Sequence, residues 1–246
     1  MQLKVIGSSS LGNCYALESS TGEILLLECG VRFDLIKKAL NHRLSNITGV
    51  LITHSHQDHC KAFEDVLKAG IYAYATPGTI DELGFPHHRA KQIIPGVEKV
   101  VGSYKVIAFD TKHDTKQPCG FLIWHSEMGT CLFLTDSYYV EYIFPGLNNV
   151  IIECNYAQDI IDHKVESGSG MKFLRDRIIE SHMSLETCKM TLQANDLSLV
   201  NNIVLVHLSN SNSDARRFKC EVEEQTGKHV HIADAGMSIN FNKDPF

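Results

Sequence analysis

The segment from residue 53 to residue 59 reads Thr-His-Ser-His-Gln-Asp-His and places four metal-capable side chains within six residues. These side chains are His54, His56, Asp58 and His59. Imidazole and carboxylate groups are typical ligands of zinc, manganese and iron rather than of soft copper sites. The apolar run at 50–52 comes directly before the segment and indicates the end of a buried strand. Such a run supplies part of a metal site, and distant residues must complete it.

Three more candidate ligands stand alone, and each comes shortly after an apolar strand-like run: His113, Asp136 and His207. Active-site groups are often mounted on loops at strand ends, where a rigid scaffold holds them. A lone His or Asp after a strand is usually only a turn residue. Together with the HxHxDH run, the three become candidates for completing the metal site.

The spacing inside the run indicates two cations rather than one. His54 and His56 are two residues apart, so they point the same way in an extended segment. Asp58 and His59 fall on the turn that enters the next helix, where they can face a second ion. Mixed histidine and carboxylate sites accept both zinc and manganese, so the expected cofactors are two divalent metal ions, Zn²⁺ or Mn²⁺.

Short β-branched runs and helical periodicity predict the elements that position these residues. The expected strands cover residues 2–6, 14–18, 23–28, 49–53, 72–75, 105–110, 120–124, 131–135, 150–153, 203–206 and 229–232. The expected helices cover residues 34–40, 59–69, 78–83, 171–180, 185–195 and 214–225. Ser184 and Ser213 are expected to cap helices, Gly70 and Gly227 to end them, and residues 163–170 to form a flexible polar loop. This order predicts an α/β fold with two sheets face to face and helices outside, in one domain over residues 1–246.

The composition limits the partners and the compartment. The net charge of −6 excludes a basic nucleic-acid coat, so an anionic substrate needs local neutralisation, which bound cations can supply. The eight cysteines form no CxxC motif and mostly lie in apolar runs, which favours reduced thiols and a cytoplasmic protein. There is no signal-peptide pattern, and no apolar stretch approaches the ~20 residues of a membrane span, so no membrane is expected as a partner.

The order of the candidate ligands resembles that of the metallo-β-lactamase superfamily, and the resemblance covers nearly the whole chain. It implies an αββα sandwich of two mixed β-sheets flanked by helices, with a dinuclear site along one sheet edge. The implied ligands of one metal are His54, His56 and His113, those of the other are Asp58, His59 and His207, and Asp136 bridges the two.

Six separate motifs look like the WalJ/YycJ-type branch of that superfamily, which is associated with 5′→3′ DNA exonuclease activity. They lie at residues 7–14, 113–121, 135–137, 153–155, 181–184 and 207–210. Two departures stand out. Glu28-Cys29-Gly30 replaces the usual Asp-Ala-Gly, so Glu28 takes the place of a carboxylate that helps to orient the metal ligands. Tyr156 stands where a histidine is usual, and departures of this kind occur in phage-encoded relatives.

The implied pair of metals suits phosphoryl chemistry. Two cations about 3.5–4 Å apart can clamp the attacking and leaving oxygens of an in-line displacement, and a water that bridges them becomes a hydroxide nucleophile near neutral pH. Asp58 can orient that nucleophile as well as bind metal. The expected function is therefore a dinuclear-metal-dependent hydrolase, a phosphodiesterase or nuclease that acts on DNA more readily than on RNA, like a 5′→3′ exonuclease.

Other residues are candidates for catalysis or for contacts with a nucleic-acid strand. His182, in the Ser-His-Met-Ser segment at 181–184, is expected to reach the scissile phosphate or protonate the leaving oxygen as in the family, with a surface histidine as the alternative. The basic candidates, which line either a groove or a solvated helix face, are Lys112, Lys116, Lys164, Lys172, Arg175 and Arg177. The aromatic candidates for base stacking are Tyr138, Tyr139 and Trp124, of which Trp124 is expected in the core.

Two other functions stay open at this point. One is a metallo-hydrolase of a small ester, lactone or cyclic nucleotide, because the same scaffold hosts many reactions. The other is a binding module that keeps the fold without metals. That second alternative predicts missing ligands, whereas all seven candidate ligands are present.

Overall fold

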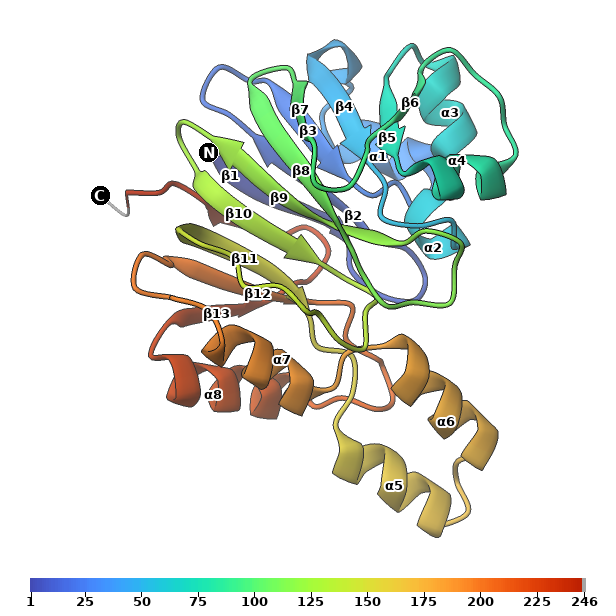
Figure 1. The fold of residues 1–246 in the computed structure, drawn as a ribbon, viewed down its shortest axis with the longest axis vertical. Helices are drawn as coiled ribbons and strands as arrows, with labels where there is room; N and C mark the ends of the chain where they lie inside the picture. The colour runs from blue at the N-terminus through green and yellow to red at the C-terminus, as the bar shows by residue number, and fades with distance from the viewer. Residues whose placement is uncertain (245–246) are drawn as a thin grey trace.

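The computed structural model describes residues 1–244. Two seven-stranded mixed sheets pack face to face, and helices cover both outer faces (Figure 1). The predicted αββα sandwich is therefore confirmed. Helices long and apolar enough to cross a bilayer are absent from this part of the chain.

The first sheet has the strand order β14-β1-β2-β3-β4-β5-β6. Its strands are β1 (Gln2–Gly7), β2 (Cys14–Glu18), β3 (Ile24–Leu27), β4 (Ile47–Leu51), β5 (Ala73–Ala75), β6 (Ala90–Gln92) and β14 (Ser238–Asn240). Strands β14, β1, β2 and β3 are antiparallel, and β3, β4, β5 and β6 are parallel. The HxHxDH segment follows β4, a central strand of the parallel half.

The second sheet has the strand order β13-β12-β11-β10-β9-β8-β7. Its strands are β7 (Glu98–Val101), β8 (Tyr104–Asp110), β9 (Cys119–His125), β10 (Gly129–Leu134), β11 (Leu147–Glu153), β12 (Asn202–Val206) and β13 (His229–Ile232). Both β8 and β10 are antiparallel to β9, and β10, β11 and β12 are parallel. Strands β8, β10 and β12 therefore end at the same edge, where His113, Asp136 and His207 follow them.

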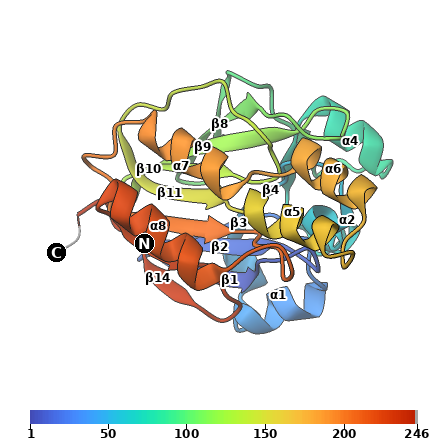
Figure 2. The same ribbon diagram turned by 90° about the horizontal axis from the view of Figure 1, so that it is seen from below.

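The helices are α1 (Phe33–Ala39), α2 (Gln57–Cys60), α3 (Phe63–Lys68), α4 (Pro77–Leu83), α5 (Gln158–Glu166), α6 (Lys172–Ser181), α7 (Leu185–Gln193) and α8 (Ala215–Thr226), with a short 3₁₀ turn at Leu44–Asn46. Apart from α2, which carries Asp58 and His59, the helices fall into three groups. Helices α1, α3 and α4 pack on the first sheet, and α7 and α8 pack on the second. Helices α5 and α6 lie side by side outside the two sheets (Figures 1 and 2).

Strand β3 shows how the apolar sequence builds three packed layers. All four of its residues are buried. Successive side chains of a strand point to opposite faces. Leu25 and Leu27 accordingly join the core between the sheets, whereas Ile24 and Leu26 join the layer under α1 and α3. The continuous apolar run therefore reflects a strand that is covered on both faces.

Several local predictions are confirmed and several are wrong. Ser184 caps α7 by accepting a hydrogen bond from the Thr187 amide, and Gly227 ends α8 in a left-handed conformation. The cap of α8 is Asp214 rather than Ser213. Residues 163–166, predicted to begin a loop, form the last turn of α5. Trp124 is not in the core. Side chains alternate along β9, so Ile123 points inward and Trp124 points outward, where it is 43% exposed.

The predicted helix at 59–69 is two helices, and the break has a backbone cause. The Ala62 amide donates to the carbonyl of Cys29 at 2.9 Å, and the Cys29 amide donates to the carbonyl of His59 at 2.8 Å. These bonds tie the α2 turn to the segment after β3 in place of a continuous helical ladder. The chain thereby fixes the orientation of α2, which carries two of the candidate ligands.

Candidate metal centre

A close backbone approach positions the HxHxDH segment. The amide of Asn13 donates to the carbonyl of Asp58 at 2.7 Å. Gly30 faces the same carbonyl, and a Cβ atom at Gly30 would lie 1.6 Å from it. Only glycine allows this contact, because any side chain at position 30 would push α2 away. The Gly30 of the Glu-Cys-Gly motif therefore sets the position of Asp58 and His59.

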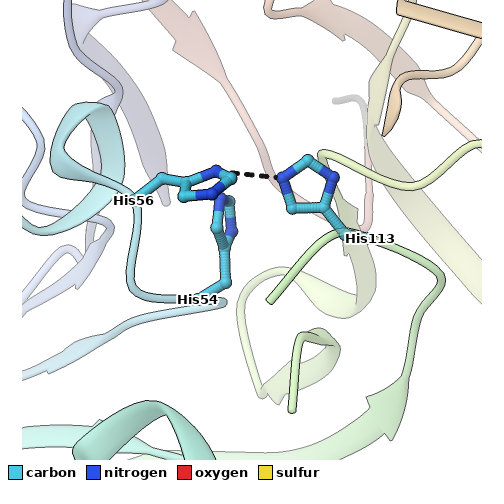
Figure 3. Close-up of side chains that lie close together, drawn as sticks. All are labelled: His54, His56 and His113. Carbon is cyan, nitrogen blue, oxygen red and sulfur yellow. Dashed lines mark hydrogen bonds between the residues drawn. The ribbon is translucent and has the colours of Figure 1, made fainter. Parts of the chain in front are cut away.

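The structure brings three candidate ligands together as one group: His54, His56 and His113 (Figure 3). One nitrogen from each ring lies within 4.8 Å of the others. The Nδ1 atom of His56 is 3.1 Å from Nε2 of His113. His54 and His56 come from the loop after β4 and His113 from the loop after β8, so both sheets contribute to this three-histidine group.

A second group lies beside the first and consists of Asp58, His59, Asp136 and His207. The Nε2 atom of His59 is 3.4 Å from Oδ2 of Asp58 and 3.4 Å from Oδ2 of Asp136. Nε2 of His207 is 3.3 Å from Oδ2 of Asp58. The same Asp136 oxygen is 3.8 Å from Nε2 of His54 and 3.7 Å from Nε2 of His113. Asp136 therefore borders both groups, the place that a bridging ligand needs.

Hydrogen bonds to the outer ring nitrogens leave the inner nitrogens available for a cation. The carbonyl of Ser181 can only accept, so Nδ1–H of His113 donates to it at 2.8 Å. Nδ1 of His54 lies 2.9 Å from the hydroxyl of Thr53, which itself donates to Glu28 at 2.6 Å. Outer partners of this kind fix the tautomer and orientation of metal-binding histidines.

The donor atoms present fit a pair of divalent ions. The Nε2 atoms of His54 and His207 are buried and have no hydrogen-bond partner among residues 1–244. A buried polar atom without a partner is costly, and a metal ion would satisfy both nitrogens. The donor set consists of five imidazoles and two carboxylates, and the imidazole of His56 lies nearest the solvent. These nitrogen and oxygen donors suit zinc or manganese.

The charges of the two groups differ. Burial lowers the pKa of His54 and of His113, which keeps both rings neutral, the form that binds metal. Burial opposes charge on His59 and His207, but Asp136 and the other carboxylates in contact with these rings together outweigh it and raise the pKa of both. In the absence of a metal, protons thus balance the carboxylates of the second group.

Strained backbone marks three residues of this centre. Glu28, Asp136 and His207 have φ angles of 63°, 47° and 55°. Residues other than glycine rarely adopt the left-handed region, and such strain persists where the surrounding structure holds it. Each of the three follows a strand closely, so the chain turns sharply there and directs the side chain into the centre.

Glu153 is a functional candidate that the sequence presented only as part of a motif. It lies at the end of β11 and is fully buried. Its Oε1 atom is 2.8 Å from Nδ1 of His182 and 3.1 Å from Nδ1 of His207. Its Oε2 atom accepts from the amides of Ser137 and Met183. In the sequence, the signal that could have singled it out is a Glu directly after the apolar run at 150–152, where a charged residue is unusual.

The ligand groups line an open cavity, hereafter the metal cavity, of about 420 Å³. Its opposite wall consists of α6 residues, including Leu174, Arg177, Ile178 and His182 just beyond the helix end. The side chain of His56 is 35% exposed and that of Asp58 24%, whereas the side chains of the other candidate ligands are at most 2% exposed. The centre is therefore accessible to solvent on the side of His56 and Asp58.

Arg177 is the only one of the six basic candidates that lines this cavity. Lys112 pairs with Glu141, Lys116 with Asp81, and Arg175 with Asp162 and Asp176. The ammonium group of Lys164 donates hydrogen bonds to the carbonyl of Ser211 and to Oδ1 of Asn212. Together with Arg175, Lys164 lines a separate cavity of about 180 Å³ between α5 and α6. The expected basic groove is thus reduced to a single guanidinium at the metal cavity.

Comparison with known proteins places this centre in a family. Residues 9–137, just over half of the chain, match the Metallo-beta-lactamase superfamily. A Streptococcus pneumoniae protein described as exodeoxyribonuclease WalJ is 26% identical over 254 residues, which cover 96% of this chain and 91% of that protein. A Bacillus anthracis protein described as exodeoxyribonuclease YycJ is 23% identical over 245 residues, 92% of this chain and 90% of that protein.

Solved structures agree on the fold. The crystal structure of the metallo-beta-lactamase fold protein YhfI from Bacillus subtilis superposes with a TM-score of 0.74 at 18% identity, over 97% of this chain and 99% of that one. The match spans the two sheets that carry the candidate ligands. The chain is therefore a hydrolase of the metallo-beta-lactamase superfamily.

Proposed function

We propose that this hydrolase cleaves phosphodiester bonds of nucleic acid, DNA more readily than RNA, as a 5′→3′ exonuclease that uses two divalent metal ions, Zn²⁺ or Mn²⁺. The observation that carries the proposal is the pair of ligand groups that meet at Asp136 on the floor of one open cavity. Relatives described as exodeoxyribonucleases, which this chain matches over nine-tenths of their length, support DNA as the substrate.

In this proposal the three-histidine group holds one cation, and Asp58, His59 and His207 hold the other, with Asp136 between them. Two bound divalent cations supply Lewis acidity toward the phosphoryl oxygens and lower the pKa of water. The carboxylate of Asp58 lies at the cavity surface, where it also orients the attacking water. Cations held by these residues would also neutralise a phosphodiester that the acidic chain otherwise repels.

His182 is proposed as the general acid. In the hydrolysis, an oxygen–phosphorus bond forms to water, the bond to the leaving oxygen breaks, and that oxygen takes a proton. The Nδ1–H of His182 donates to Glu153 at 2.8 Å, which leaves Nε2 to carry the transferred proton. Burial lowers the pKa of His182, but Glu153 and then Asp136 outweigh burial and raise it, so the ring is protonated at higher pH than usual.

The first prediction tests the ligand assignment. Asp136→Ala removes the carboxylate common to both groups, and His56→Ala removes the most exposed of the candidate histidine ligands. Both variants should lose cleavage of labelled DNA by at least a hundredfold after metal reconstitution, because each lacks a ligand. His229→Ala, a change of an exposed histidine on β13, is the matched control and should cleave like the wild type. Retained metal-dependent cleavage in Asp136→Ala would refute the assignment.

The substrate class is tested with a panel. It contains 5′-labelled DNA, RNA of the same sequence, a cyclic nucleotide and an acyl-homoserine lactone. Release of mononucleotides from the 5′ end of DNA is the expected result. Hydrolysis of the lactone or the cyclic nucleotide without DNA cleavage would replace the nuclease proposal by that of a small-molecule hydrolase.

A further inference from the structure

A second cavity opens beside the metal cavity and is here named the side cavity. It has a volume of about 630 Å³. The two cavities share four lining residues: His113, Asp114, Arg177 and Ser181. The side cavity adds Tyr138, Ile179 and Glu180. Because the shared residues include a candidate metal ligand, a molecule that occupies the side cavity lies directly beside the reacting phosphate.

The backbone holds Tyr138 at this place. Its amide donates to the carbonyl of Lys112 at 3.3 Å. The preceding hydroxyl of Ser137 accepts from the Lys112 amide at 3.0 Å and donates to the carbonyl of Tyr139 at 2.6 Å. The segment that follows Asp136 is thereby fastened to the segment that precedes His113. The Tyr138 ring remains 43% exposed, so it is held in position and still accessible.

Arg177 stands at the junction of the two cavities with unused hydrogen-bond donors. Its side chain is 70% exposed, and its only ion pair among the described residues is a loose one, 4.0 Å from Asp114. Arg175, two residues earlier, donates to Asp162 at 2.5 Å and to Asp176 at 2.9 Å. Arg177 is also the one arginine or lysine that lines either cavity within residues 1–244. A phosphate placed beside the scissile group would find its cation there.

The lining of the side cavity carries both signs of charge. Arg177 offers a cation to a phosphate, whereas Asp114 and Glu180 contribute carboxylates. The Tyr138 ring and these carboxylates suit a base, which presents a flat π-face and amino groups. Aromatic side chains bind bases of single strands by stacking with little regard to sequence. The volume lies within the range usual for sites of small organic groups.

We propose that the side cavity binds the nucleoside adjacent to the scissile phosphodiester, with its base against Tyr138 and its neighbouring phosphate at Arg177. This inference rests on the proposed nuclease function and makes it more specific. Substrates with a base at this position are cleaved faster than substrates that have only the sugar and phosphate. Tyr138 is thus a residue that determines substrate preference rather than a metal ligand.

The test uses duplex DNA in which a tetrahydrofuran residue replaces the nucleotide on one or the other side of the first bond cleaved. The wild-type enzyme should show about a tenfold lower kcat/KM with the abasic residue at one of these two positions, the size of a lost stacking contact. Tyr138→Ala should cleave the intact and the abasic DNA at the same rate. Tyr138→Phe should keep the discrimination, because it keeps the ring.

Matched controls separate the cavity from a general loss of activity. Tyr139→Ala changes the neighbouring exposed ring, which lines neither cavity, and should discriminate like the wild type. Arg177→Ala should weaken binding of every DNA substrate equally and reduce the salt dependence of binding, because one phosphate contact is lost. Arg216→Ala, on an exposed position of α8, should change neither. Unchanged metal content and Tm show that the variants are folded.

The possible failures can be told apart. Equal rates for intact and abasic DNA in the wild type would overturn the side-cavity inference while the nuclease function stands. Discrimination that survives in Tyr138→Ala would overturn it as well. If the wild type cleaves no DNA but hydrolyses another member of the substrate panel, the nuclease proposal fails and this inference fails with it.

Discussion

Glu153 is a single buried carboxylate that contacts two histidines of different proposed roles. Its Oε1 atom faces the candidate ligand His207 and the proposed acid His182, and its Oε2 atom accepts from two backbone amides. A carboxylate can satisfy all four donors, because each oxygen accepts twice. The residue therefore positions both histidines and keeps the His182 ring protonated to a higher pH.

Replacing Glu153 by Gln tests this role. The variant places an NH₂ group where two donors now meet an acceptor, which should lower stability by about 1–3 kcal/mol. The larger effect should be on kcat, which should fall by tenfold to a hundredfold, with the alkaline limb of its pH profile moved to lower pH, because His182 loses its negative partner. The measurements are metal content and kcat between pH 5 and 9. An unmoved pH profile would contradict the link to His182.

The candidate ligands could be predicted at this scale because their types and spacing are unusual. Four of the seven lie within six residues, and the other three follow apolar runs. The roles of Glu153, Tyr138 and Arg177 could not be singled out in the same way, because Tyr138 and Arg177 were only two among several aromatic and basic candidates and Glu153 was only part of a motif. Their roles depend on which strand ends and which helix face meet in space, and a single Glu, Tyr or Arg in a sequence carries no such information.

Edge strands are the elements that the sequence reveals least. The three unpredicted strands, β6, β7 and β14, all lie at a sheet edge. Edge strands are short and carry exposed charged residues that discourage pairing with other chains. Lys91 and Glu98 interrupt the apolar alternation there. The one edge strand that was predicted, β13, has the alternating sequence His-Val-His-Ile with Val230 buried in the core.

Strand β13 also carries a pH-sensitive residue. Burial and the neighbouring His229 lower the pKa of His231 to about 4, from about 6.5 for a histidine in an unfolded chain. The unfolded state then binds the proton first, so this contribution to stability is present above pH 6.5 and is lost as the pH falls toward 4. The free energy of unfolding should drop by up to about 1.4 kcal/mol per pH unit in that window, less for partial solvent screening.

Denaturant unfolding at pH 7, 5.5 and 4.5, with metal present throughout, checks this prediction. His231→Gln keeps a polar side chain near Asn202 but cannot titrate, so its stability should depend less on pH than that of the wild type. The ligands of the metal centre are the same in both proteins and cancel in the comparison. Parallel pH dependence in the two proteins would exclude a role for His231.

At the scale of the whole molecule, the candidate metal centre lies between the two sheets. His54, His56, Asp58 and His59 come from the first sheet, and His113, Asp136 and His207 come from the second. Ions bound by the proposed ligands would therefore act as crosslinks across the sandwich. The resemblance to the superfamily predicts that the candidate ligands meet at one edge, which is where β4, β8, β10 and β12 end. Composition alone does not predict this.

Metal loading should therefore raise the Tm. A ligand at a hundred times its Kd stabilises the folded state by about 2.7 kcal/mol. For a chain of this size that corresponds to a rise in Tm of roughly 5–10 °C. Calorimetry of chelator-treated protein, with and without added zinc or manganese, measures the shift. Asp136→Ala should show a much smaller shift, and equal Tm values for the metal-free and metal-loaded wild type would contradict the crosslink.

The candidate ligands come from both the early and the late part of the chain, which has a consequence for biosynthesis. The HxHxDH segment leaves the ribosome long before His207, so the nascent chain displays histidines that hold a cation only weakly. Strand β14 then closes the first sheet by pairing Gln2 with Asn240. With the proposed ligand set, tight cation uptake would be one of the last events of maturation, and a chain that ends before residue 207 would lack one of the ligands.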